Sequence, residues 1–275
     1  MYKIACGVVL YYPDIEKIIR ETMEYSSIFD KVILFDNTEK NNCEIQERLS
    51  ELQNVIYITY NKNMGLPYAY NKILEEVMEC DFLCALDQDS KYNSIDIISM
   101  IDAIADFPVD AAVVGPHVIY DNEKFCKKDE FVKKRYVITS GCFINLNYMR
   151  REAILFDENY FIDKFEVDLD MQFRVKGYSI YQYENACLYQ RLGTIGKNGK
   201  SNHSKLRHYY LFRNRYYFNN KYFCIPKRYF LNILQTFRHI MSIILFEENK
   251  AEKIVQWPIA TYDYIAGRMG IYRIN

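Results

Sequence analysis

Hydrophobic and polar residues alternate in blocks along the N-terminal third of the chain, in a pattern that predicts strands separated by helices. Segments that are apolar almost throughout predict buried strands at 3–12, 31–37, 54–61 and 81–87. Strands of this kind, separated by helical segments of about ten to fifteen residues, are typical of a parallel sheet covered on both faces. The pattern therefore predicts an α/β fold.

The segments between these strands carry apolar residues at helical spacing. Asp14 can cap the first helix, whose expected apolar stripe consists of Ile15, Ile18, Ile19 and Met23. A polar helix is expected around 43–53. A third helix is expected over 65–80, with an inward side formed by Leu66, Ala69, Ile73, Leu74 and Val77.

Polar residues collect where the predicted strands end. The residues at or just beyond these ends are Asp36, Asn61, Asn63 and Asp87. Ligands of parallel sheets bind outside the carboxyl ends of the strands, so we expect these side chains to share one crevice.

Two aspartates flank a glutamine in LDQDS (86–90), directly after the fourth strand. Burying a carboxylate is costly unless a partner balances its charge. In a turn that leaves a strand, Asp87 and Asp89 can reach a common point, and paired carboxylates suit Mg²⁺ or Mn²⁺ when a ligand diphosphate completes the shell. The alternative is a solvated turn in which Asp89 and Ser90 cap the next helix.

Composition supports a folded protein, because 50% of the residues are hydrophobic and 26% are charged. The 8 cysteines are scattered without metal-site spacing, which favours free thiols and a cytoplasmic protein. The N-terminal segment has no long apolar region, so no signal peptide is expected.

The formal net charge is only −1, but basic residues greatly outnumber acidic ones from Arg191 onward. This asymmetry indicates an anionic partner for the C-terminal third, such as a phosphate group, nucleic acid or an acidic membrane surface. The alternative is that the basic third only neutralises the acidic remainder of the chain.

The segment 227–246 has apolar residues at helical spacing on one side and polar residues on the other. No run reaches eighteen uninterrupted apolar residues, so no membrane-spanning segment is expected. Two interpretations remain open. The helix lies on an anionic membrane surface as a peripheral contact, or it packs on the catalytic domain or on a second subunit of a homodimer.

Several motifs occur in an order that resembles inverting family 2 glycosyltransferases of the GT-A fold, and especially their bacterial rhamnosyltransferase-like branch. The resemblance covers nearly the whole chain. It rests on YYP (11–13), FDN (35–37), NKNMGLPYAYN (61–71), LDQDS (86–90), TSGCFIN (139–145), VDLDMQFRVKGY (167–178) and HSKLRHYYLFRNRYYF (203–218).

The resemblance implies a GT-A domain at 1–220, with a nucleotide-binding half (1–115) and an acceptor half with a lid (116–220), followed by a helical extension at 221–275. The lid includes the loop 193–204, which is expected to move. The implied nucleotide-binding and donor-binding residues are Tyr11, Asp36, Asn63, Gly65, Asn71, Asp87, Tyr209, Arg213 and Asn214.

The resemblance also implies a metal site and a catalytic base. The metal, Mg²⁺ or Mn²⁺, would be held by Asp87 and Asp89, with His203 either a third ligand or a solvated loop residue. The segment after FID (161–163) is longer than in the family pattern, so Glu166, Asp168 and Asp170 compete for the role of base. Counting back from Arg174 favours Asp168, followed by Asp170.

The implied reaction moves a sugar from a nucleotide sugar to a glycan or lipid-linked acceptor. The expected donor is dTDP-L-rhamnose, with a UDP-hexose as the alternative. Two other classes were weighed. A nucleotidyltransferase would need an early Gly-rich loop with Arg or Lys, which CGVVLYYPD (6–14) lacks. A nucleic-acid-binding protein could use the basic, Tyr-rich stretch 205–230, but the strand-end acids would repel a phosphate backbone, so no nucleic-acid partner is expected.

Overall fold

The structure is a computed structural model of the 275-residue chain, and it describes residues 1–40, 42–120, 125–190 and 202–272. The chain forms two compact units. The sheet unit comprises Met1–Asp157 and Glu166–Arg191, and the helical unit comprises Glu158–Phe165 and Leu192–Asn275. Residues 205–220 thus belong with the C-terminal helices, whereas the sequence analysis groups them with the sheet.

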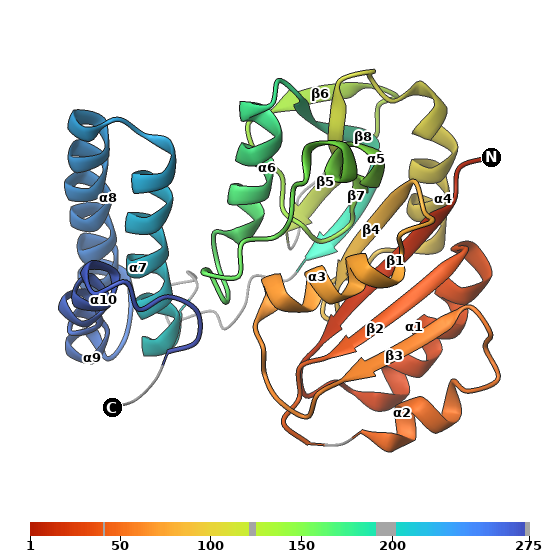
Figure 1. Cartoon of the computed structure of the whole chain (residues 1–275), viewed down its shortest axis with the longest axis horizontal. Coiled ribbons are helices and arrows are strands. Elements are labelled where there is room, and N and C mark those ends of the chain that lie inside the picture. The colour runs from red at the N-terminus through yellow and green to blue at the C-terminus, as the bar shows by residue number, and fades with distance from the viewer. Residues whose placement is uncertain (41, 121–124, 191–201, 273–275) are drawn as a thin grey trace. The chain divides into compact units, whose positions relative to one another are not determined.

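The sheet unit contains one mixed sheet, which is eight-stranded over the described residues and has the order β3-β2-β1-β4-β7-β5-β8-β6 (Figure 1). Its strands are β1 Ile4–Leu10, β2 Lys31–Asp36, β3 Val55–Thr59, β4 Phe82–Asp87, β5 Ala111–Tyr120, β6 Phe131–Lys134, β7 Cys142–Asn145 and β8 Ser179–Gln190. Strands β1 to β4 are parallel, and β7 is antiparallel to both β4 and β5. The predicted strands are confirmed, and the mixed α/β sheet with a helical C-terminal region agrees with the expected GT-A fold.

The helices of this unit are α1 Ile15–Ile28, α2 Cys43–Arg48, α3 Leu66–Glu76, α4 Ser94–Asp102, the 3₁₀ helix η1 Ala103–Asp106, α5 Leu146–Glu152 and α6 Phe165–Val175. Alternate residues of β1, including Cys6 and Val8, face a core shared with α1 and α4. Gly7 faces α3, and a Cβ at this position would lie 2.8 Å from Ile73. This glycine therefore lets α3 pack closely on the central strand.

The first helix begins as predicted, because the side chain of Asp14 accepts a hydrogen bond from the Lys17 amide. Its expected apolar stripe is wrong at one position. Met23 is 50% exposed, while Thr22 and Tyr25 are buried. Positions 22 and 25 continue the face of Ile18 at a period of 3.6 residues, and residue 23 has rotated away from that face. The second helix ends at Arg48, earlier than expected.

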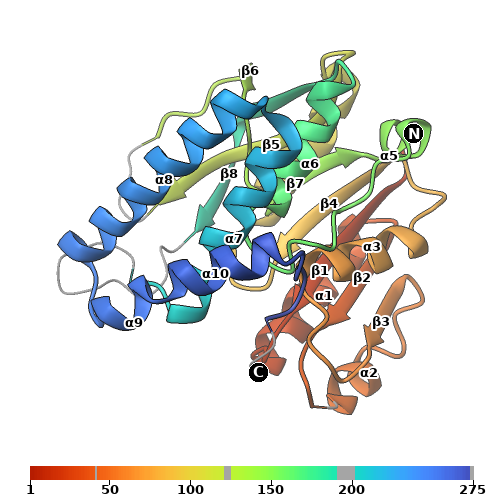
Figure 2. The same ribbon diagram turned by 60° about the vertical axis from the view of Figure 1, so that its left-hand side comes forward.

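The helical unit is built from α7 Lys205–Tyr222, α8 Ile225–Phe246, α9 Lys250–Ile254 and α10 Gln256–Ile265. Both α8 and α10 pack on α7 (Figure 2). The buried apolar residues of this unit include Tyr209, Tyr210, Phe212, Ile243 and Ala260.

All eight cysteines are free, and Cys6, Cys84 and Cys142 are buried, as predicted for thiols that act as small apolar side chains. In the described part of the chain one helix, α8, is long and apolar enough to cross a membrane by length and composition alone. The sequence had predicted no membrane-spanning helix.

Candidate active site

Strand β4 ends at Asp87, beside the turn that leads into β7. The main-chain amide of Asp87 donates to the hydroxyl of Ser140 at 3.1 Å, and that hydroxyl donates to Ser90 at 2.8 Å. The amide of Gly141 donates to the carbonyl of Ala85 at 2.7 Å. Gly141 has φ = +80°, a conformation that favours glycine. The small-residue turn at 139–141 therefore fixes the point at which the Asp87–Asp89 turn leaves the sheet.

The carboxyl of Asp87 lies in a strongly acidic environment. Burial, together with the negative charges of Asp89 and Glu166, raises its pKa to about 7. Asp89 is exposed. The end of β4 thus holds more negative charge than nearby groups of the described chain offset, which is the electrostatic condition expected of a cation-binding site.

Helix α6 carries the three carboxylates that compete for the role of base. Glu166 and Asp170 are four residues apart and share one face of the helix. Burial raises the pKa of Asp170 well above its usual value, although the Val137 amide, which donates to it at 2.9 Å, acts against this shift. Burial also raises the pKa of the Cys142 thiol, with further contributions from Asp170 and Asp87. The Glu166 face of α6 therefore borders the end of β4.

Asp168 is directed elsewhere. Its residue is fully buried, and it accepts a hydrogen bond of 2.8 Å from Gln172, whose amide also donates to the carbonyl of Leu155 at 3.0 Å. Glu166 is only half-buried. The role expected for Asp168 stays a prediction. Glu166 is the least buried of the three residues, although its Oε2 atom is buried, and it is the one whose charge acts on Asp87. The residue count alone ranked it lower.

Asp36, expected to contact the nucleotide base, lies buried at the end of β2. Its carboxylate accepts from the Thr38 amide at 2.8 Å, the Asn42 side chain at 2.6 Å and the Tyr57 hydroxyl at 2.7 Å. Burial and this bond to Asp36 raise the pKa of Tyr57. The aspartate thus organises the loop after β2, and its contact with a base stays a prediction.

The two tyrosines that follow β1 form an exposed aromatic pair. Their ring centroids are 4.8 Å apart and the rings meet edge to face. Tyr11 is 46% exposed and Tyr12 is 53% exposed. The Tyr12 amide donates to Thr38 at 2.8 Å, which ties the pair to the loop after β2. An exposed, anchored aromatic pair at the strand ends is suited to stack on a planar base.

Gln88, between the two aspartates, holds this aromatic pair in place. Its side-chain carboxamide makes two hydrogen bonds with the main chain of Tyr11. Its main-chain carbonyl accepts a hydrogen bond from the Lys17 side chain at 2.6 Å. The sequence alone predicts no role for Gln88. The only signal for it was its position between the paired aspartates.

Asn63, Gly65 and Asn71 shape the chain around the start of α3. Asn63 accepts from the Gly65 amide at 3.0 Å, and Gly65 has φ = +86°. The side chain of Asn37, which the sequence analysis did not single out, bonds to both Met64 and Gly65. Asn71 exchanges two hydrogen bonds with the main chain of Phe156. The observed contacts of these residues are structural, and their contacts with a donor stay predictions.

Three expected donor-binding residues, Tyr209, Arg213 and Asn214, lie buried in the helical unit. Arg213 donates to the carbonyl of Gly270 at 2.7 Å and lies within 3.5 Å of the Asn159 carbonyl. Asn214 lies within 3.0 Å of the carbonyls of Tyr160, Ile162 and Asp163. Tyr209 donates to Asp263 at 2.8 Å. Through these bonds, Arg213 and Asn214 hold the segment 159–163, which leads into α6.

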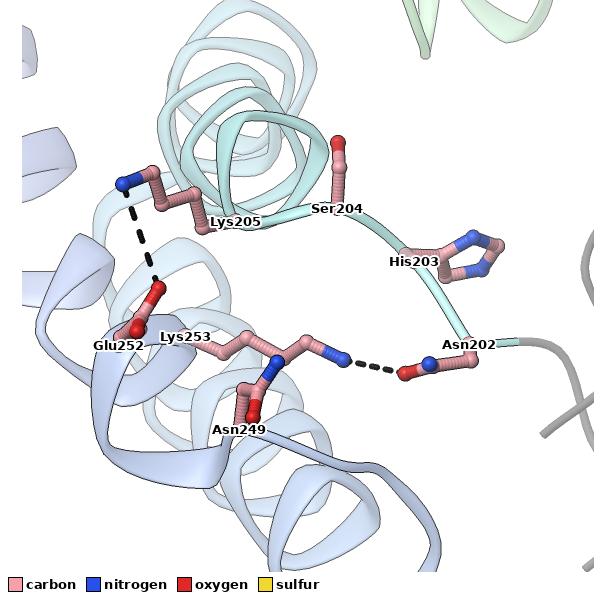
Figure 3. A pocket seen from close by; sticks show the side chains of 7 residues that line it. All are labelled: Asn202, His203, Ser204, Lys205, Asn249, Glu252 and Lys253. Carbon is pink, nitrogen blue, oxygen red and sulfur yellow. Dashed lines mark hydrogen bonds and ion pairs between the residues drawn. The ribbon is translucent and has the colours of Figure 1, made fainter. Parts of the chain in front are cut away.

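His203 borders a polar cavity of about 400 Å³ at the start of α7. The other residues lining it are Asn202, Ser204, Lys205, Asn249, Glu252 and Lys253 (Figure 3). Two cation contacts cross its rim, from Lys253 to Asn202 and from Lys205 to Glu252. His203 belongs to the helical unit and the Asp87–Asp89 pair to the sheet unit, so its metal role stays a prediction. Most of the expected lid, 193–204, lies outside the described residues.

Over the described ranges, no group of three or more His, Cys, Asp or Glu side chains is arranged to hold a metal ion. A diphosphate-bound Mg²⁺ keeps most of its shell from ligand and water oxygens and needs only one or two carboxylates. Asp87 and Asp89, in their acidic environment, fit that smaller requirement.

Comparison with solved structures identifies similar folds. S. aureus TarS 1–349 matches with a TM-score of 0.56 and 13% identity over 95% of this chain and 72% of that chain. The same protein in complex with UDP-GlcNAc matches with a TM-score of 0.55 and 14% identity, over 95% and 73%. A longer S. aureus TarS structure gives 0.57 and 13%, over 97% and 43%. Identities this low show the fold alone.

No curated protein matches the chain in sequence. The model of the family "Glycosyl transferase family 2", however, matches residues 11–238. That range includes β2 to β8, the Asp87–Asp89 turn and the carboxylates of α6. The match covers most of the chain, and the observed fold agrees with it. The chain therefore belongs to glycosyl transferase family 2 and is a glycosyltransferase.

Proposed function

We propose that this protein transfers one sugar from a nucleotide sugar to a hydroxyl group of a bacterial surface glycan or lipid-linked acceptor, with inversion at the anomeric carbon. The observation that carries the proposal is the position of Asp87 at the carboxyl end of β4 together with that of Glu166, whose charge acts on the Asp87 carboxyl, in the first turn of α6. It relates a carboxylate at the end of β4 to a half-buried carboxylate in the first turn of α6. A leaving group and an attacking hydroxyl need two such sites on opposite sides of one sugar.

On this proposal the exposed rings of Tyr11 and Tyr12 accept the nucleotide base, in a position held by Gln88. Asp87 and Asp89 would hold Mg²⁺ or Mn²⁺, which offsets the charge that develops on the departing diphosphate. His203 is a further candidate ligand. The diphosphate leaves without protonation, so the site needs no second carboxylic acid of the kind that a glycosidase uses.

We assign proton removal to Glu166. Its carboxylate would accept the proton of the acceptor hydroxyl while the oxygen forms its bond to the anomeric carbon and the bond from that carbon to the diphosphate oxygen breaks. A general base must reach the acceptor, and Glu166 is more accessible than the buried Asp168 and Asp170. Asp168 is the second candidate, because the residue count from Arg174 favours it.

The leading donor is dTDP-L-rhamnose, which rests on the resemblance to the rhamnosyltransferase-like branch. The alternative is a UDP-hexose. It is supported by the complex of TarS with UDP-GlcNAc, at an identity of only 14%. The two donors differ in the base, the sugar hydroxyls and the C6 substituent, so pocket contacts decide between them.

Nucleic-acid binding through the Tyr-rich segment has less support than it had from the sequence. Tyr209, Tyr210, Arg213 and Tyr216 are all buried in the helical unit. Stacking on single-stranded bases requires exposed rings. The basic residues of this segment that remain exposed include Lys205, Arg207 and Lys221.

A donor panel tests the proposal. Thermal stabilisation by dTDP-rhamnose, UDP-glucose and UDP-GlcNAc should be measured with Mn²⁺ and with EDTA, together with donor consumption in the presence of a surface-glycan acceptor. We expect one donor to stabilise the protein in a Mn²⁺-dependent manner. Asp89→Ala should abolish turnover without unfolding the protein, and Asp102→Ala, an exposed aspartate of α4, should not. Full activity in excess EDTA would exclude the metal role.

A further inference from the structure

Helix α8 turns its polar side toward the protein. Asn232 and Gln235 bond to Asn219 of α7 at 2.7 and 3.0 Å. Thr236 bonds to the Tyr216 hydroxyl at 2.9 Å. A surface helix of a globular protein normally buries an apolar stripe and exposes its polar side. In the central turns of α8 this arrangement is reversed.

A chain of hydrogen bonds extends the polar contact between α7 and α8. Arg215 bonds to Nδ1 of His239 at 3.3 Å, Nε2 of His239 to Nδ1 of His208 at 2.9 Å, and Nε2 of His208 to Glu247 at 2.9 Å. Arginine only donates hydrogen bonds and an ionised carboxylate only accepts them. With both imidazoles neutral, all three bonds therefore run in one direction: Arg215 donates to His239, His239 to His208, and His208 to Glu247. These polar contacts show that this side of α8 packs on α7.

The opposite side of α8 is apolar and exposed. Only 11% of its most apolar eighteen-residue window is buried. The exposed large apolar residues, here called the α8 stripe, are Ile225, Tyr229, Phe230, Ile233, Phe237, Ile244 and Leu245. From Phe230 onward they follow helical spacing, with Ile233, Phe237 and Ile244 on one side of the helix. A contiguous apolar surface of this kind marks a site of contact with a partner.

The charges of α8 restrict the choice of partner. Its ionised side chains are Lys227, Arg228 and Arg238, and its sequence contains no aspartate or glutamate. A two-fold contact between copies places the same surface on both subunits, so the partner's α8 would offer these cations only further cations and no carboxylate within the helix. An anionic lipid surface offers opposite charge to the cations and an apolar interior to the stripe.

A helix lying in the interface accounts for the contacts of α8 better than a helix crossing the bilayer. Crossing would carry the bonded side chains of Asn232, Thr236 and His239 through hydrocarbon, together with the polar residues of α7 that they contact. Lying in the interface leaves the α7 contact on the aqueous side.

We infer that the α8 stripe docks the protein on the surface of an anionic membrane, with α8 parallel to the bilayer plane. This inference is independent of the sugar, the metal and the catalytic base. It assigns the apolar side of α8 to lipid acyl chains and the flanking Lys227 and Arg238 to lipid phosphates.

Vesicle co-sedimentation without nucleotide sugar tests the inference. The full chain should pellet with vesicles of phosphatidylglycerol and phosphatidylcholine, much less with phosphatidylcholine alone, and less at high salt. The double variant Ile233→Ser, Phe237→Ser should reduce the partition coefficient by about tenfold or more, because it removes two large apolar side chains from the contact. Ile233 is 72% exposed and Phe237 is 62% exposed, so the fold should tolerate both changes.

A matched double variant provides the control. Ile95→Ser, Val109→Ser removes two apolar residues that are 77% and 91% exposed on the sheet unit, and vesicle binding should be unchanged. Lys227→Gln, Arg238→Gln should weaken binding to anionic vesicles and make the residual affinity less sensitive to salt.

Three results would overturn the inference. The first is a native chain that stays in the supernatant with anionic vesicles. The second is a stripe variant that pellets as the native chain does. The third is a stripe variant that converts a dimer to a monomer in sedimentation velocity while vesicle binding persists, which would assign the stripe to a second copy of the chain. Circular dichroism of each variant verifies that the comparison is made between folded proteins.

Discussion

The carboxamide of Gln88 and the main chain of Tyr11 exchange two hydrogen bonds of 2.8 Å. The Tyr11 amide donates to Oε1 of Gln88, and Nε2 of Gln88 donates to the Tyr11 carbonyl. This pair joins the residue that follows β1 to the turn that follows β4. It connects the aromatic pair proposed to bind the base with the aspartates proposed to bind the diphosphate.

We predict that Gln88→Ala weakens nucleotide binding. Losing both hydrogen bonds releases the Tyr11 backbone and should cost about 1.4 kcal/mol, which is tenfold in Kd. Isothermal titration with UDP and dTDP measures it. Gln256→Ala removes the one hydrogen bond that Gln256 donates to the Glu252 carbonyl in the helical unit. It should leave nucleotide affinity unchanged, and an equal effect of the two variants would contradict the role given to Gln88.

The second prediction concerns the catalytic base. Glu166→Gln should lower kcat by a factor of roughly 10² to 10⁴ with little change in donor affinity, because the substitution removes only proton transfer. Asp168→Asn is the informative comparison. It should alter stability through its buried bond to Gln172 more than it alters kcat per folded molecule. Single-turnover kinetics with calorimetric unfolding distinguish the two effects, and the reverse pattern would restore Asp168 as the base.

A third prediction follows from the contacts of Asn214. The segment that it holds includes Phe161, Asp163 and Lys164, whose φ angles are 61°, 57° and 73°. Non-glycine residues adopt this region only when the surroundings enforce it. Asn214→Ala would remove the hydrogen bonds that its side chain donates to the partly buried carbonyls of Ile162 and Asp163, and it should reduce the free energy of unfolding by about 1–3 kcal/mol.

Chemical denaturation measures the effect of Asn214→Ala. Asn220→Ala, an exposed asparagine of the same helix, is the matched control and should have a much smaller effect. Arg213→Lys should also destabilise, since one ammonium cannot reproduce the contacts of a planar guanidinium. Unchanged stability with weaker donor binding would instead return Arg213 and Asn214 to the donor site.

The fourth prediction concerns pH. Burial lowers the pKa of His239 to about 3, with smaller contributions from Arg215 and His208, and burial also lowers the pKa of His208. The unfolded chain therefore binds more protons than the folded chain below the ordinary histidine pKa of about 6.5. The contribution of the neutral His239 and His208 to the stability of the folded chain is complete above pH 6.5. It declines as the pH falls from 6.5 toward 3.

Hydrogen exchange of peptides from α7 and α8 between about pH 7 and pH 5, corrected for the intrinsic rate, measures this decline. His239→Gln should make the pH dependence shallower. Protonation of Glu247 also lowers the stability of the folded chain, at lower pH. Burial opposes its ionisation, but the bonds from Lys253 and His208 lower its pKa. A variant with the native pH profile would exclude the histidine pair as the cause.

Much of the sheet could be predicted because its strands bury both faces. Residues of β1 from Ile4 to Leu10 are all buried, so the strand is a continuous apolar run, and the change to helical spacing after Asp14 is unambiguous. The acidic turn could be predicted for the same reason. Once β4 is identified, the position of Asp87 at its carboxyl end follows from the topology of parallel sheets.

The functions of individual side chains could not be predicted in this way. Gln88 acquires its role from Tyr11, which is distant in sequence, and no local pattern reports that contact. The spacing of Glu166, Asp168 and Asp170 gives their relative directions on α6 but not which direction faces Asp87. For Arg213, the charge suggested a phosphate partner, whereas the structure satisfies it with main-chain carbonyls. In α8, amphipathicity was evident, but only the packing on α7 shows which side is inside.

The position of β8 has a consequence for how the protein folds during synthesis. Strands β1 to β4 lie side by side near the N-terminus, so they can pair while the nascent chain is still short. Strand β6, in contrast, pairs with β8, through residues such as Val132 and Gln182. It must wait on the ribosome until β8 has emerged. The nascent chain would thus complete the Tyr11–Gln88 side of the site well before Glu166 and its helix have a finished sheet to pack on.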